Sequence, residues 1–141
     1  LDDDLSILYQ PFGNYNGSDN IEYIIYDDDL EPSNIAIISI IINPVNDAPV
    51  LTDIGTDSTF EDNPLVIELS ASDIDEDELI FTSESYNANV SASIDENQLT
   101  LTPSQDYNGS AQIKVVVSDE ELKDMDVPEA FVSVVDKDES V

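Results

Sequence analysis

Four residue types that carry much of protein chemistry are missing from this chain. Its 141 residues include no cysteine, histidine, arginine or tryptophan. Without cysteine, a disulfide and a thiolate zinc site are both excluded. The chain also lacks the commonest general base, the residue that clamps anions with two parallel hydrogen bonds, and the best aromatic platform for a sugar ring. Glycoside hydrolysis by a carboxylate pair survives as an enzymatic alternative, but we predict that the chain is not an enzyme.

Positive charge is almost as scarce. Three lysines face 33 acidic residues, which gives a formal net charge of -30. Such a field repels phosphate groups, so we expect no nucleic-acid partner and no docking on anionic membranes. No apolar run approaches the roughly 18 to 20 residues that span a bilayer, so we expect no membrane insertion. The same field attracts cations, and either bound divalent ions or high salt without any specific metal site would offset the self-repulsion.

Apolar residues make up 40% of the chain and alternate with polar ones. Leu65, Ile67 and Leu69 follow this period of two, as does the stretch 113–117. Alternation of this kind is typical of half-buried strands, and no stretch has a helical period. About seven short strands separated by turn residues within roughly 90 residues predict an all-β fold, an antiparallel Ig-like or cadherin-like β-sandwich.

The chain repeats itself. Residues 11–30 align without a gap on residues 103–122, at an offset of 92 residues. Residues 33–42 resemble 128–135 once two residues are inserted in the second copy. Such self-similarity indicates a tandem array. We therefore predict the C-terminal half of one repeat in 1–43, a linker in 44–49 and a complete repeat in 50–141, and we expect the half repeat to fray, exchange strands or dimerise.

The predicted linker lies within the sequence NPVNDAPV, residues 43–50. Pro44 and Pro49 fix their own φ angles and bias the preceding residues to an extended conformation. Asn46 and Asp47 place an amide oxygen and a carboxylate in this stiff backbone, where such oxygen atoms suit a cation held between two domains. An ordinary proline-rich turn with solvated polar residues is the alternative.

Three aspartates form the strongest chemical pattern. In an extended segment Asp73, Asp75 and Asp77 project to one side, because side-chain direction repeats every second residue. Their carboxylates repel one another unless a cation lies among them, and Ca²⁺ takes roughly 6 to 8 oxygen ligands. This predicts a calcium site, with a solvated acidic loop as the alternative. An EF-hand loop is disfavoured, because Glu78 stands where that loop requires glycine and the flanks look like strands.

The linker, the aspartate pattern and the repeat together resemble those of a known family. The NPVNDAPV linker, the pair Asp73 and Asp75, the segment 107–119 and the 92-residue period resemble the cadherin-like repeats of large bacterial surface proteins, also called tandem-95 or VCBS-type domains. The resemblance implies Ca²⁺ between successive domains. The ligands that it implies at the first junction are Asn46, Asp47, Asp73, Asp75 and Asp119. At the far end it implies that Glu61 and Asp106 await a following linker.

The resemblance and the charge together predict a calcium-stiffened spacer in an extracellular or cell-surface protein. The expected partners are neighbouring repeats of the same chain and a homophilic, cell-surface or polysaccharide ligand. The alternative is an accessory carbohydrate-binding or interaction module of a secreted enzyme. Such a module would bind sugar through exposed tyrosines such as Tyr86.

Overall fold

The computed structural model describes residues 6–122 and 130–137. The chain forms two compact units, Leu1–Val45 and Asn46–Val141, here called the hairpin unit and the sandwich unit. The boundary between them falls inside the segment 44–49 that the sequence predicts to be a linker. The part of the predicted complete repeat in 123–129 and 138–141 lies outside the described residues. No helix among the described residues is long and apolar enough to cross a membrane.

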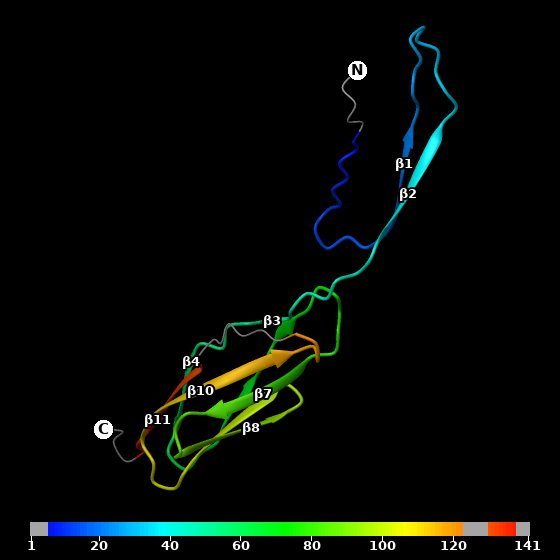
Figure 1. The fold of residues 1–141 in the computed structure, drawn as a ribbon. Coiled ribbons are helices and arrows are strands. Elements are labelled where there is room, and N and C mark those ends of the chain that lie inside the picture. Colours follow the sequence, from blue (N-terminus) through cyan, green and yellow to red (C-terminus); the bar gives the residue numbers. More distant parts are fainter. Residues whose placement is uncertain (1–5, 123–129, 138–141) are drawn as a thin grey trace. The chain divides into compact units, whose positions relative to one another are not determined.

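The hairpin unit contains two antiparallel strands (Figure 1), β1 (Gly17–Tyr23) and β2 (Ala36–Ile42). Gly17 lies opposite Ile42, and Tyr23 lies opposite Ala36. A long connection joins the two strands. Asp27 tightens it, because its Oδ1 accepts hydrogen bonds from the backbone nitrogen atoms of two residues further along the connection.

The sandwich unit is built from two layers of strands. One layer is a four-stranded sheet in the order β4 (Thr56–Phe60), β11 (Ala130–Val135), β10 (Gly109–Ser118), β7 (Ile80–Ser85). The other contains a three-stranded sheet in the order β5 (Leu65–Glu68), β9 (Gln98–Pro103), β8 (Val90–Asp95), and the short pair β3 (Val50–Leu51) and β6 (Ala71–Ser72).

The core confirms the predicted β-sandwich. Alternate residues of β10 point inward, so that Ile113, Val115 and Val117 are fully buried, and Leu99 and Leu101 of β9 are buried from the other layer. Burying one such side chain completely contributes roughly 1.5–3 kcal/mol. The rest of the buried apolar cluster consists of Leu51, Leu69, Val90, Ala111, Ala130, Val132 and Val134.

One pairing differs from the predicted antiparallel arrangement, because β4 pairs with β11 in parallel. The described residues of the sandwich unit form nine strand segments, because the first two of its seven strands are each broken in two. The prediction of about seven strands therefore holds. Between β3 and β4 the chain bends at Gly55, whose φ of 70° suits glycine best. The bend lets one segment contribute to both layers.

The two units share a local structure around their matching tyrosines. In the hairpin unit the hydroxyl of Tyr15 donates to the carbonyl of Ser18 at 3.0 Å. In the sandwich unit Tyr107 donates in the same way to the carbonyl of Ser110 at 3.1 Å. The repeat seen in the sequence is therefore also a repeat of backbone shape.

Strand register corrects the predicted two-residue insertion. Gly17 faces Ile42 in β1 and β2, and Gly109 faces Val134 in β10 and β11. Both members of the pair are displaced by 92 residues, so no insertion separates the paired parts of the two copies. Apolar residues that alternate with a period of two match equally well after a shift of two positions. The sequence alone therefore could not distinguish the alignment with the insertion from the alignment without it.

Candidate metal centre

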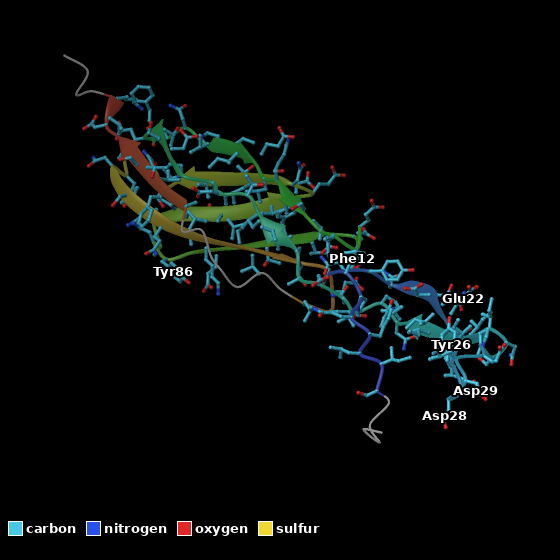
Figure 2. All side chains as sticks on the ribbon, turned by 90° about the horizontal axis from the view of Figure 1, so that it is seen from above. Phe12, Glu22, Tyr26, Asp28, Asp29 and Tyr86 are labelled. Carbon is cyan, nitrogen blue, oxygen red and sulfur yellow. The ribbon has the colours of Figure 1, made fainter. Side chains whose placement is uncertain are left out.

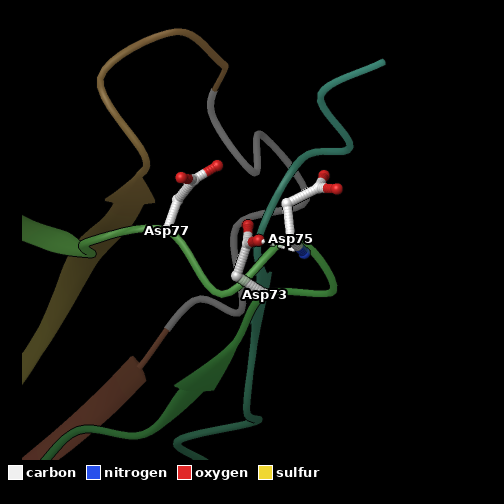
Figure 3. A group of neighbouring side chains, drawn as sticks. All are labelled: Asp73, Asp75 and Asp77. Atoms are coloured by element: carbon white, nitrogen blue, oxygen red, sulfur yellow. Dashed lines mark hydrogen bonds between the residues drawn. The ribbon is translucent and has the colours of Figure 1, made fainter. Parts of the chain in front are cut away.

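Three aspartates lie in the loop between β6 and β7, here called the aspartate loop. One carboxylate oxygen from each of Asp73, Asp75 and Asp77 lies within 4.8 Å of the others (Figure 3). The backbone nitrogen of Asp75 donates to Oδ1 of Asp73 at 2.8 Å, which holds the first turn of the loop. Glu76 has a φ of 62°, and this left-handed residue reverses the chain between Asp75 and Asp77. The predicted trio is thus brought together.

One oxygen of this loop stands out. Oδ2 of Asp73 is buried and has no hydrogen-bond partner among the described residues. A buried carboxylate oxygen without a partner is costly, because it has lost water and gained nothing in exchange. Asp75 and Asp77 are exposed, so the loop is open to solvent on one side. Carboxylate oxygen atoms of three aspartates, one of them with a buried oxygen, fit a Ca²⁺ or Mg²⁺ ion.

The linker residues contact the same end of the sandwich unit. The backbone nitrogen of Asp47 donates to Oδ2 of Asp75 at 2.8 Å. The side-chain nitrogen of Asn46 donates to Oδ2 of Asp119 at 2.8 Å. Both predicted linker residues therefore touch predicted acidic ligands. Asn46 does so as a hydrogen-bond donor, a role that the sequence did not indicate because an asparagine amide can donate or accept.

Asp119 is held firmly just after β10. It is 7% exposed, and its Oδ1 accepts hydrogen bonds from the backbone nitrogen atoms of Glu121 and Leu122. The hydrogen bond from Leu122 is the main reason why the pKa of Asp119 lies below its ordinary value, although burial opposes it. Asp119 therefore stays anionic at neutral pH. Its Oδ2 connects it to the linker through Asn46.

The remaining two predicted ligands lie at the other end of the sandwich unit. Here Asp62 accepts a hydrogen bond from the backbone nitrogen of Asp106 at 2.9 Å and one from Nζ of Lys137 at 2.7 Å. Nζ of Lys137 is also 4.0 Å from a carboxylate oxygen of Glu61, which is 7% exposed. We call this end of the sandwich unit, which is marked by Glu61, Asp62, Asp106 and Lys137, the lysine end. Sequence reasoning gave no role to Lys137 there.

The two carboxylates nearest Lys137 respond in opposite directions. Burial raises the pKa of Glu61 and nearby Asp136 raises it further, while Lys137 opposes both. The hydrogen bond from Lys137 lowers the pKa of Asp62. The lysine ammonium therefore already supplies a positive charge to the place where the resemblance to cadherin-like repeats implies a metal ion.

Residues 46–125 match the model of a protein family described as a bacterial Ig domain. The chain belongs to the bacterial Ig domain family. The matched range lies within the sandwich unit and begins at its first residue. No curated protein matches the chain in sequence.

Several solved structures resemble the bacterial Ig domain chain in shape. An endo-fucoidan hydrolase of glycoside hydrolase family 107 is 18% identical with a TM-score of 0.50, and the match covers 86% of this chain and 19% of that one. A titin domain is 13% identical (TM-score 0.44, covering 66% and 99%). Two domains of an S-layer protein are 17% identical (TM-score 0.42, covering 72% and 59%). This chain thus spans about a fifth of the hydrolase, and the likeness is one of fold.

Proposed function

We propose that the sandwich unit is a calcium-binding, cadherin-like spacer of an extracellular or cell-surface protein, with the ion held by the aspartate loop. The observation that carries this proposal is Oδ2 of Asp73, which is buried without a hydrogen-bond partner beside the carboxylates of Asp75 and Asp77. Bacterial Ig-like domains often belong to surface or secreted proteins, and their fold is typically non-catalytic. Both facts support a spacer role.

The ion would stiffen the linker through Asp75. This carboxylate accepts a hydrogen bond from the backbone of Asp47 and also belongs to the aspartate trio. Single hydrogen bonds contribute only about 0.5–1.5 kcal/mol, so the linker contacts at Asp75 and Asp119 alone hold it weakly. An ion that binds only the folded loop stabilises that loop by mass action, and with it the surface on which the linker lies.

Glu61 and Asp106 remain proposed ligands at the lysine end, with a weaker expected affinity. Lys137 lies 2.7 Å from Asp62 and would have to be displaced or share its carboxylates with the ion. A divalent ion therefore competes with a tethered ammonium there, whereas the described residues place no lysine contact on the aspartate loop. We propose that the aspartate loop fills first.

A carbohydrate-binding role is the second candidate. Tyr86 is 59% exposed and projects from the surface of the sandwich unit (Figure 2). An exposed aromatic ring can stack on a sugar. The calcium proposal predicts that Ca²⁺ binding does not change in Tyr86→Ala. The carbohydrate proposal predicts that this variant binds sugar less well, so the variant distinguishes the two roles. Loss of polysaccharide retention on affinity electrophoresis in this variant would favour the second candidate.

Thermal unfolding tests the calcium proposal. The chain is heated in EDTA, in millimolar Ca²⁺, and in NaCl of matched ionic strength. We expect Ca²⁺ to raise the Tm more than NaCl does. The double variant Asp73→Asn/Asp75→Asn should lose this difference, while the matched control Asp95→Asn/Glu96→Gln, which removes two exposed charges elsewhere, should keep it. Equal stabilisation by NaCl would instead mean salt adaptation without a specific metal site.

A further inference from the structure

The hairpin unit exposes the residues that its counterpart buries. Ile25 is 61% exposed, whereas Val117 at the matching position of the sandwich unit is 0% exposed. Tyr23 is 42% exposed, whereas its match Val115 is 1% exposed. These side chains belong to the face of the hairpin that corresponds to the buried face of β10 and β11. The other pairs that become more exposed in the same way are Ile21 with Ile113, Ile38 with Ala130, Ile40 with Val132, and Ile42 with Val134.

Two stretches of the hairpin unit match strands of the sandwich unit but form no strand themselves. In the sandwich unit each of these stretches pairs with a strand that has no counterpart in the hairpin unit. β10 runs to Ser118 because Val116, Val117 and Ser118 pair with β7. The matching residues 24–26 are not part of β1, which ends at Tyr23 where its pairing with β2 ends. Residues 6–11 match β9 but form no strand, and β9 is paired on both sides, with β5 and β8. The sequence repeats, and the structure repeats only where a partner exists.

We infer that the β1 and β2 hairpin is an interaction surface for the front half of a repeat of the same type as residues 46–92. One strand of that partner would pair antiparallel with β1, as β7 pairs with β10. Another would pair in parallel with β2, as β4 pairs with β11. The partner's second layer would cover this exposed face of the hairpin, which is apolar except for Asp19, whose carboxylate accepts a hydrogen bond from Tyr9.

The edges of the hairpin favour this occupant over a second copy of the chain. Two identical hairpins related by a two-fold axis meet edge to edge in antiparallel fashion, so they cannot supply the parallel neighbour that β11 has. Pairing of β1 with its own copy would also bring together two strands that each carry Asp19 and Glu22.

A disulfide in a cysteine-free chain tests the register directly. A copy of residues 46–92 is added before Leu1 of the full chain, so that residue 92 precedes Leu1 as it precedes Ser93 in the repeat. Cysteine replaces Thr82 of the added copy and Ile24, which matches Val116. Thr82 faces Val116 in the sandwich unit, so we expect this pair to oxidise almost completely, as in a control chain with Thr82→Cys and Val116→Cys. The extent is read by mass spectrometry of peptides under non-reducing conditions.

Two further chains keep the test decisive. In the off-register control, Ser83→Cys of the added copy replaces Thr82→Cys, and little disulfide should form because the two side chains lie on opposite faces. In a repacked chain, Tyr9→Leu, Tyr23→Val and Ile38→Ala copy the smaller residues of the sandwich unit, which removes overpacking as a cause of failure. Absence of the in-register disulfide in both fused chains would overturn the inference. So would a disulfide-linked dimer of the unfused Ile24→Cys chain, which would name a second copy as the occupant.

Discussion

Both ends of the sandwich unit bring carboxylates close together, but the two ends differ in the positive charge that lies beside them. Asp119 follows β10 and Lys137 follows β11, and because these strands are antiparallel the two residues lie at opposite ends. At the lysine end, Nζ of Lys137 neutralises the cluster from within the chain. At the aspartate loop, Asp73 keeps a buried oxygen without a partner. The comparison teaches that two acidic clusters of one domain can differ in the positive charge that the chain itself provides, and we propose that this difference decides where an ion binds first.

Removal of the lysine should have the largest effect on this contrast. Lys137→Gln leaves Glu61 buried beside Asp62 without the ammonium, so we expect a lower Tm in EDTA than for the wild type. Ca²⁺ should then restore more stability than it adds to the wild type, because the lysine end gains a vacancy for a cation. Lys114→Gln, which removes a lysine opposite Glu84 on the outer face of β10 and β7, is the control and should change neither Tm nor calcium response appreciably.

Titration should separate the two ends by sign. The pKa of Glu61 is raised, so its contribution to stability is present below the ordinary glutamate value of about 4.3 and is lost as pH rises through the folded value. The pKa of Asp119 is lowered, so its contribution is present above about 3.9 and is lost as pH falls through the folded value.

Tm measured against pH in EDTA checks these signs. Glu61→Gln should raise the Tm at neutral pH and change little in strong acid. Asp119→Asn should lower the Tm at neutral pH and flatten the decline in acid. Shifts of the same sign at neutral pH for both variants would show that the two ends do not differ as described.

Replacement of the Asn46 amide by a carboxylate should make the contact between the linker and Asp119 depend on a metal ion. Asn46→Asp places a carboxylate against Oδ2 of Asp119, where the wild-type amide donates a hydrogen bond at 2.8 Å. We expect a Tm lower by a few degrees in EDTA and a larger rise on adding Ca²⁺. Gln112→Glu, which likewise replaces an amide by a carboxylate but lies in the middle of β10, away from both ends, serves as the matched control. An unchanged calcium response in Asn46→Asp would place the ion away from the linker.

The smallest effect should come from the turn of the aspartate loop. Glu76 has a φ of 62°, a conformation that costs a side chain other than glycine or asparagine about 1 kcal/mol. Glu76→Asn should therefore raise the free energy of unfolding by up to about 1 kcal/mol and leave the calcium response intact, as followed by urea unfolding. Glu78→Asn removes the same charge without relief of a positive φ and should not be stabilising by this route. Loss of the calcium response in Glu76→Asn would make Glu76 a ligand.

Much of the sandwich follows from local chemistry that the sequence displays. The period of two in 113–117 correctly predicts the buried face of β10, since strand side chains alternate between faces. The trio of Asp73, Asp75 and Asp77 comes together as predicted, but the chain turns at Glu76 instead of running extended as the sequence argument assumed. The repeat found in the sequence also has a structural counterpart, because Tyr15 and Tyr107 donate to matching carbonyl groups.

The features that escaped prediction depend on partners far apart in the sequence. The parallel pairing of β4 with β11 joins residues some 75 positions apart and has no local signal. Lys137 reaches Asp62 across the same distance, so its role could not be assigned from spacing. The stretches 6–11 and 24–26 fit the same pattern, because their sequence suits a strand and their matching residues in the sandwich unit pair with strands distant in sequence.

Calorimetric titration with Ca²⁺ tests the central claim most directly. The wild type and Asp73→Asn/Asp75→Asn are titrated at one fixed ionic strength, with Asp95→Asn/Glu96→Gln as the charge-matched control. The account predicts saturable binding in the wild type and the control, and loss of the tightest binding event in Asp73→Asn/Asp75→Asn. Binding of unchanged affinity and stoichiometry in the double variant would contradict it, and would leave the buried oxygen of Asp73 without the role given to it here.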